Sequence, residues 1–171
     1  MSIPQEAPKI PGWRPVIFLN IEADEPKSIY VNNTGSLTGV NITGGFAKSI
    51  DPKYPFDAII DSGYDDIRAD PGASTSRLDC RVYLTTSEGA GVFMTYPGVV
   101  RMEKSVVDVL TQKSSFMEFN DGYVTCTPVI HLDEKAKKEQ WITKETLFGK
   151  GRFVRDNEGR LRVQYYLYVL A

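Results

Sequence analysis

The chain has 171 residues, of which 42% are hydrophobic and 25% are charged, and its formal net charge is −2 at pH 7. This length and composition are typical of one globular domain with a sizeable core. Because acidic and basic residues are interspersed and nearly balanced, neither nucleic acid nor an anionic membrane surface is expected as a partner.

Residues 1–14 contain three prolines and little periodicity, which predicts an N-terminal arm followed by a single domain over residues 15–171. The first residues do not form a signal peptide pattern, and no stretch approaches the ~18–20 apolar residues of a membrane span. We therefore expect a cytoplasmic protein in which Cys80 and Cys126 are buried free thiols.

Runs of alternating apolar and polar residues follow one another along the chain, separated by turn signals. Strands are expected near residues 16–21, 28–31, 36–43, 56–61, 77–86, 91–96, 123–131 and 161–170. The segments expected to form turns are 32–35, 62–68, 87–89 and 156–159, each rich in Gly, Asn, Asp or Ser.

Two prolines and two short segments complete the expected elements. Pro97, followed by Gly98, is expected to end a strand, and Pro128 to lie at an edge or a bulge. Residues 102–112 carry a weak helical face, and residues 133–140 fit a single helical turn. About nine short strands with one or two short helices predict an all-β fold, either a sandwich or a barrel.

The strongest chemical signal lies around the strand 77–86. Along this strand Arg81 lies on the same face as Asp79 and Tyr83. Such a polar, aromatic face fits either a surface edge or a polar interior. Asp65, in the expected turn upstream, can meet Arg81 at one barrel mouth. A carboxyl group in a partly dry cavity has a raised pKa and donates a proton near neutrality. Arg81 would then stabilise an enolate or phenolate; the alternative is a structural salt bridge.

Several aromatic side chains are expected as walls of such a cavity. These substrate-binding candidates are Tyr64, Tyr83, Tyr96, Trp141, Tyr166 and Tyr168.

The residues present argue against a metal or a nucleotide cofactor. One histidine and two distant cysteines do not supply a usual set of metal ligands. No glycine pair lies at a strand-to-helix junction, where phosphate groups bind. A structural role is expected for His131, which would mark the alternative site if Asp65 and Arg81 form only a structural pair.

Motifs spread over most of the chain resemble a family of small bacterial and fungal β-barrels, catalogued as domain of unknown function thirty-two thirty-seven. The family shows a glycine pair, a turn containing an aspartate, an Asp-Gly turn and a Leu-Asp-x-Arg-Tyr-x-Leu strand. A Trp-Leu-Asn segment and a Val-Gly-x-Gly segment follow near the end. The matching segments here are Thr43-Gly44-Gly45, Ser62-Gly63-Tyr64-Asp65-Asp66, Asp70-Pro71-Gly72, residues 78–84, Trp141-Ile142-Thr143 and Phe148-Gly149-Lys150-Gly151.

This resemblance implies an antiparallel barrel with an internal cavity. Divergent fungal members belong to natural-product pathways and act as cofactor-free cyclases, by hetero-Diels–Alder reaction or by intramolecular addition of a phenol to an alkene. The chain is therefore expected to close an oxygen heterocycle on a hydrophobic polyketide or meroterpenoid without a cofactor. The alternatives are a non-catalytic barrel that binds a small hydrophobic ligand and a structural or regulatory partner protein. Because Pro128 predicts an edge strand, a homodimer is expected.

Overall fold

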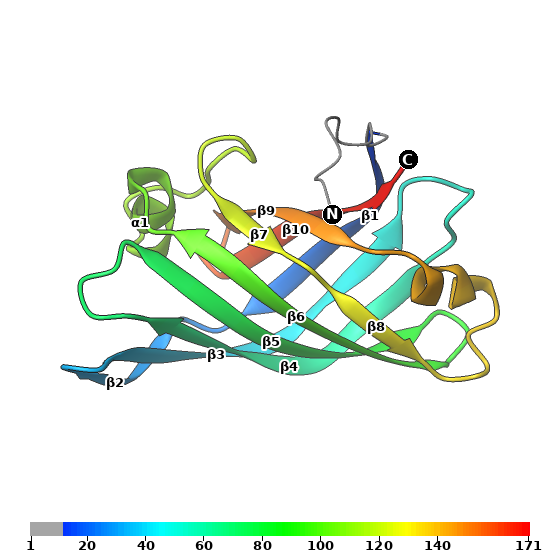
Figure 1. Cartoon of the computed structure of the whole chain (residues 1–171), viewed down its shortest axis with the longest axis horizontal. Helices are drawn as coiled ribbons and strands as arrows, with labels where there is room; N and C mark the ends of the chain where they lie inside the picture. Colours follow the sequence, from blue (N-terminus) through cyan, green and yellow to red (C-terminus); the bar gives the residue numbers. More distant parts are fainter. Residues whose placement is uncertain (1–11) are drawn as a thin grey trace, which may run out of the picture.

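The computed structural model describes residues 12–171, which form a ten-stranded sheet and two short helices (Figure 1). The first six strands are β1 (Trp13–Ala23), β2 (Lys27–Asn32), β3 (Gly35–Ser49), β4 (Asp57–Ala69), β5 (Thr75–Thr86) and β6 (Gly91–Arg101). Helix α1 (Lys104–Leu110) follows. The remaining elements are β7 (Val124–Cys126), β8 (Val129–Leu132), the 3₁₀-helix η1 (Lys138–Lys144), β9 (Phe148–Arg155) and β10 (Leu161–Leu170).

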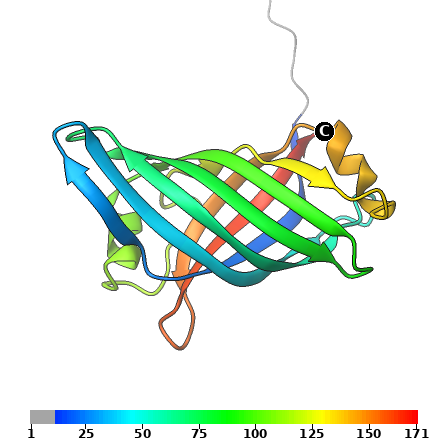
Figure 2. The same ribbon diagram turned by 90° about the horizontal axis from the view of Figure 1, so that it is seen from below.

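Eight strands close into an antiparallel barrel, whose tilted strands are visible from below in Figure 2. The order is β1-β10-β9-β7-β6-β5-β4-β3, and β3 pairs back onto β1. Strand β2 extends the sheet beyond β3, while β8 pairs with β6 beyond the point where β7 ends. Helices α1 and η1 lie at opposite ends of the barrel in Figure 1. The predicted all-β antiparallel barrel is confirmed.

One predicted turn is wrong. Residues 62–68 continue strand β4, which pairs with β3 on one side and with β5 on the other. Asp65 faces the interior, whereas the other polar side chains of this segment lie on the outer face of the strand, and partners on both sides satisfy the backbone groups. The true turn comes later, where a backbone hydrogen bond of 3.1 Å joins the Ala73 N–H to the Asp70 carbonyl oxygen.

Two prolines share one junction on the barrel wall. Pro97 does not end β6, as expected, but lies where β6 exchanges one partner, β8, for the other, β7. The expected strand at 123–131 is interrupted at this same junction, between β7 and β8, and Pro128 lies in the gap. The gap places both prolines where no ladder hydrogen bond is required from their missing N–H groups.

An irregularity in β4 reverses which residues face the interior. Ala58 and Ile60 are buried, whereas Ile59 is exposed. The pairing with β5 then shifts by one residue between Ile60 and Ser62, and such a slip exchanges the two faces of a strand. Beyond the shift, odd-numbered residues such as Asp65 line the interior.

A neighbouring irregularity lies where β3 meets β1. The register shifts between Glu22 and Ala23, beside Gly45, whose φ is +124°. A Cβ atom at this position would collide with the backbone carbonyl oxygen of Asn20. Only glycine fits both the conformation and the space, so Gly45 allows the strands that close the barrel to approach each other.

The barrel interior is filled unevenly along its axis. Toward η1 it is packed with apolar side chains, among them Ile17, Leu19, Val82 and Met94, which are almost fully buried. Toward α1 the inward side chains leave a cavity. The packed half supplies core burial, and the hollow half leaves room for a ligand.

The start of the chain is only partly described. The expected arm falls mostly on residues 1–11, which lie outside the described residues. Trp13 already belongs to β1, and its ring packs against Phe148 with 5.6 Å between centroids. Within residues 12–171, no helix is long and apolar enough to cross a membrane.

The expected homodimer stays a prediction, with the unpaired edge of β2 as its clearest structural support. Among the described strands, β2 pairs only with β3, and Ile29, Tyr30 and Val31 are exposed on it. Such an edge offers backbone groups and apolar area to a second copy. We expect light scattering at micromolar concentration to give twice the chain mass of 19.1 kDa; a single chain mass would contradict the prediction.

Candidate active site: an apolar cavity with a buried carboxyl group

A cavity of about 300 Å³ occupies the α1 half of the barrel. Most of its wall is apolar, with side chains such as Ile21, Val40, Leu78 and Phe153 from four different strands. Ligand pockets in proteins are typically hollows of roughly 300–1,000 Å³ with an apolar wall and a few polar groups. This cavity therefore has the character of a binding site for a small ligand.

Asp65 lies on the cavity wall, opposite Cys80 in the β4–β5 ladder. Its Oδ1 accepts a hydrogen bond of 3.1 Å from the backbone N–H of Asp79. Burial raises the pKa of Asp65 from its usual 3.8 to about 7, supported by the charges of Asp79 and Asp66 and opposed by the Asp79 N–H bond. Near neutral pH the carboxyl group can therefore both donate and accept a proton.

Two phenols and two thiols from other strands of the barrel lie near Asp65. Cys80 and Tyr96 are paired neighbours on β5 and β6, and Cys126 and Tyr165 come from β7 and β10. All four are buried, and the cysteines are free. Burial is the main cause that raises the pKa of each of these thiols and phenols well above its ordinary value, so all four groups stay protonated at neutral pH.

Two glycines on β9 make room for this cluster. A Cβ atom on Gly149 would collide with the Sγ atom of Cys126, and one on Gly151 would collide with the ring of Tyr165. The Gly149-Lys150-Gly151 segment therefore has a spatial role, because side chains there would displace the groups around Asp65.

An ion pair closes one side of the cavity mouth near α1. Glu25, from the β1–β2 connection, lines the cavity, and its carboxylate accepts hydrogen bonds of 2.5 and 3.1 Å from Arg155. The Arg155 side chain is only 4% exposed and also donates to the carbonyl oxygens of Val109 and Leu110. Arg155 thus joins β9, helix α1 and the β1–β2 connection at the mouth.

Arg81 does not share this cavity with Asp65, so the expected arrangement is wrong. The inward residues of β5 are Leu78, Cys80 and their alternate neighbours, and Arg81 points to the outer face. There it forms a salt bridge of 3.1 Å with Asp79 and lies 5.5 Å from the centre of the Tyr64 ring. Strand alternation puts neighbours on opposite faces, and Arg81 is opposite Tyr64 rather than Asp65.

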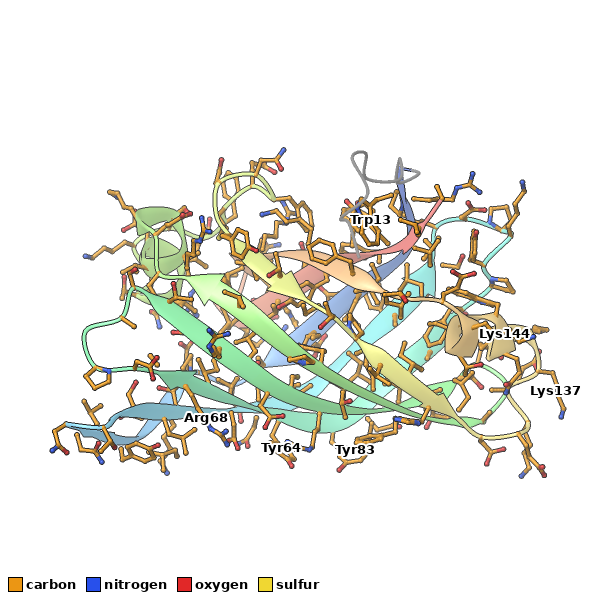
Figure 3. All side chains as sticks on the ribbon, viewed as in Figure 1. Trp13, Tyr64, Arg68, Tyr83, Lys137 and Lys144 are labelled. Carbon is orange, nitrogen blue, oxygen red and sulfur yellow. The ribbon has the colours of Figure 1, made fainter. Side chains whose placement is uncertain are left out.

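Among the six expected wall residues, Tyr96 lines the cavity. Tyr64 and Tyr83 are 38% and 45% exposed, and Figure 3 shows both on the outside of the barrel, below β4 and β5. Tyr83 stacks on Phe93, which stacks on His131, with ring centroids 5.4 and 6.1 Å apart. The His131 side of the barrel is therefore an outer aromatic surface.

The other three expected wall residues also lie away from the cavity. Trp141 lies in η1, at the opposite end, and its Nε1 donates a hydrogen bond of 2.9 Å to the carbonyl oxygen of Pro55. Tyr166 packs on the outer face between Phe18 and Phe119, with centroid distances of 5.2 and 5.0 Å. Tyr168 shares this outer face of β10.

Sequence reasoning missed Tyr165, which is fully buried and lines the cavity. The signal was present, because Leu161, Val163, Tyr165, Leu167 and Val169 form the apolar face of β10. Alternation alone therefore assigns Tyr165 to the interior and its two tyrosine neighbours to the outside.

We expect the Arg81→Ala variant to fold normally and to lose no more than about 1 kcal/mol of stability, the scale of exposed ion pairs. Arg81 and its partner Asp79 have side chains that are 36% and 44% exposed, so water screens their attraction. Urea unfolding measures the loss. Binding of any cavity ligand should be unchanged, and a hundred-fold weaker binding would show that Arg81 acts on the cavity.

No metal site was found in the described part of the chain. Within residues 12–171, no three His, Cys, Asp or Glu side chains gather closely enough to hold a metal ion.

A comparison with known protein families gives a match over nearly the whole chain. The chain matches the family described as "Protein of unknown function (DUF3237)" over residues 11–170. It belongs to this family. The resemblance inferred from the glycine and aspartate motifs is therefore confirmed. None of the curated proteins matches the chain.

Solved structures show the same fold at low sequence identity. A conserved protein of unknown function from Rhodopseudomonas palustris has a TM-score of 0.76 at 17% identity, covering 96% of this chain and 100% of its own. A β-barrel-like protein from Acinetobacter baumannii has a TM-score of 0.68 at 18% identity, covering 98% of this chain and 100% of its own. An enzyme from Penicillium herquei has a TM-score of 0.60 at 15% identity, covering 97% of this chain and 98% of its own. At such identities the likeness concerns the fold.

Proposed function

We propose that this protein is a cofactor-free cyclase of natural-product metabolism that closes an oxygen heterocycle on a substrate held in the barrel. The observation that carries the proposal is Asp65, whose pKa is about 7 inside a cavity with a mostly apolar wall. A group with this pKa is suited to general acid–base catalysis at neutral pH. The related fold of an enzyme from Penicillium herquei supports catalysis by analogy of fold.

Asp65 could perform an addition of a phenol to an alkene with no net consumption of protons. The protonated carboxyl group gives its proton to one alkene carbon, and the phenol oxygen attacks the other carbon. The phenol proton then passes to the Asp65 carboxylate, which restores the acid. One C–O and one C–H bond form while the O–H and the π bond break, so product and substrate have the same mass. The apolar wall contributes by holding the reactive conformer.

A non-catalytic carrier of a small hydrophobic ligand is the second candidate. The outward position of Arg81 favours it, because the cavity wall formed by residues 12–171 then has no cation beside Asp65 to stabilise a developing oxyanion. In that case the raised pKa of Asp65 is only a consequence of its burial and its acidic neighbours, and it has no catalytic role.

The proposal is tested by deleting the gene in its source organism and comparing metabolites. The deletion strain should accumulate an uncyclised precursor. Purified protein added to an extract of that strain should convert it into an isomer of identical mass, whereas heat-denatured protein should not. Binding of the precursor without conversion would support the carrier and contradict the cyclase.

Two related expectations stay predictions. The activity should need no added metal or coenzyme, which metal analysis and the absorption spectrum of the purified, active protein can check. A cytoplasmic location, as expected from the sequence, is checked by fractionating cells that express the chain.

A further inference from the structure

The hydroxyl group of Tyr165 is a buried donor on the cavity wall. The side chain is fully buried, and within residues 12–171 its hydroxyl group has no hydrogen-bond partner. Leaving a buried hydroxyl group unpaired costs about 1–3 kcal/mol. Such a group in a ligand-sized cavity is a ready partner for an acceptor atom of the ligand.

Packing fixes where this hydroxyl group can be. The ring of Tyr165 fills the space that Gly151 leaves by lacking a Cβ atom. On the other side the ring of Tyr96 meets it edge-on, with 5.8 Å between centroids and an interplanar angle of 61°. The ring is therefore held between two strands, and the donor is pre-positioned for a ligand.

The surroundings keep the phenol in its donor form. Burial, followed by the neighbouring Cys126, Asp65 and Cys80, raises the pKa of Tyr165 well above its ordinary value, and the nearby Tyr96 side chain opposes this rise without reaching hydrogen-bond geometry. The ionisable groups that face it are Asp65 from β4, Cys80 from β5, Tyr96 from β6 and Cys126 from β7. None of these is a cation, so the phenol stays protonated.

The charges on the cavity wall select against anionic ligands. Among the described residues that line the cavity, the charged types are Asp65 and Glu25, and Glu25 is paired with Arg155. A carboxylate or phosphate would lose its hydration without meeting a free cation, which is strongly unfavourable. The volume of about 300 Å³ is at the small end of ligand pockets.

We propose that the Tyr165 hydroxyl group donates a hydrogen bond to a carbonyl oxygen of the substrate. The cavity then takes small, uncharged, mostly apolar ketones or quinone-type molecules. This inference rests on the proposed function in placing the substrate in this cavity. It assigns the oxygen-binding role to Tyr165, a residue on the interior face of β10, and it places the carbonyl beside Asp65.

The test compares two probes of nearly equal shape, α-tetralone, which has a carbonyl oxygen, and tetralin, which does not. Wild-type protein should bind α-tetralone about three- to ten-fold more tightly, the factor that one net hydrogen bond supplies. Tyr165→Phe should remove this preference by weakening α-tetralone binding alone. Tyr166→Phe is the matched control, because it removes a hydroxyl group from the outer face and should leave both affinities unchanged.

A spectroscopic measurement makes the assignment independent of affinity. The infrared carbonyl band of bound α-tetralone should lie at lower frequency in the wild type than in Tyr165→Phe. The substitution keeps the ring and deletes an unpaired hydroxyl group, so the variant should unfold at the wild-type temperature or above. The anionic probe 1-naphthoate should not bind at pH 8.

The inference is overturned if α-tetralone does not bind, if it binds no better than tetralin, or if the carbonyl band is the same in both proteins. Tighter binding of 1-naphthoate than of α-tetralone would overturn the preference for uncharged ligands. These readouts are separate from turnover. If the protein prefers α-tetralone to tetralin but catalyses no cyclisation, only the proposed function is contradicted. If it catalyses cyclisation and Tyr165→Phe does not change the rate, only this inference is contradicted.

Discussion

Replacing Asp65 with asparagine is expected to lower turnover about a hundred- to ten-thousand-fold, the scale of lost general acid–base catalysis. Asparagine has nearly the same shape, and its Oδ1 can still accept the hydrogen bond from the Asp79 N–H. The barrel should therefore remain folded, as circular dichroism can verify. Substrate binding should change far less than turnover, because the amide cannot donate a proton to the reacting atom.

The same substitution should remove a pH dependence of stability. Because burial raises the pKa of Asp65 from 3.8 to about 7, the folded protein keeps a proton that the unfolded chain releases between these values. The folded state thus binds more protons, and the free energy of unfolding falls as pH rises through this window. The fall should total roughly 2 to 4 kcal/mol, and Asp65→Asn should lack it.

Urea unfolding at a series of pH values from 4 to 8 measures this contribution, and rates measured over the same series report the catalytic role. A wild-type rate that declines above about pH 7, with no such decline in the variant, would agree with an acid at Asp65. Equal rates for the two folded proteins would remove Asp65 from the mechanism and leave the carrier as the better interpretation.

The Gly45→Ala variant is expected to lose at least about 3 kcal/mol of stability, by strained backbone and steric overlap together. Gly45 has φ of +124°, where alanine is strained, and its Cβ atom would overlap the Asn20 carbonyl oxygen. The clash falls between β1 and β3, the pairing that closes the barrel. Urea unfolding with linear extrapolation measures the loss.

Gly91→Ala is the matched control for this prediction. No atom of residues 12–171 lies within 4 Å of the position that a Cβ atom on Gly91 would take, so alanine there should be neutral or slightly stabilising by restricting the unfolded chain. If Gly45→Ala were as stable as Gly91→Ala, the close approach of β1 and β3 would not depend on glycine.

Local patterns in the sequence were sufficient to predict the class of fold and the positions of most of its strands. Alternation and turn residues placed β1, β2, β5 and β10 within a few residues of their observed positions. This works because side-chain alternation and turn chemistry are properties of neighbouring residues. The same alternation correctly divided β5 into an apolar face containing Cys80 and a polar face containing Arg81.

The tertiary structure decided which of these faces turns inward. The polar face of β5 was expected to meet Asp65 in the cavity, but the apolar face fills the barrel because burying it removes more apolar area from water. Arg81 consequently lies outside with Asp79. The sequence of β10 contained enough information to place Tyr165 inside, since its second neighbours are all apolar.

The position of Asp65 could not be obtained from local alternation. Continuing the pattern of Ala58 and Ile60 along β4 would put Asp65 on the outer face, with Ile59. The shift between Ile60 and Ser62 reverses the faces. It lies in the segment where β4 and β3 both leave regular pairing, close to Gly45 and its contact with β1. The Asp65 carboxyl group thus reaches the cavity through the pairing of strands distant in sequence, which no local pattern encodes.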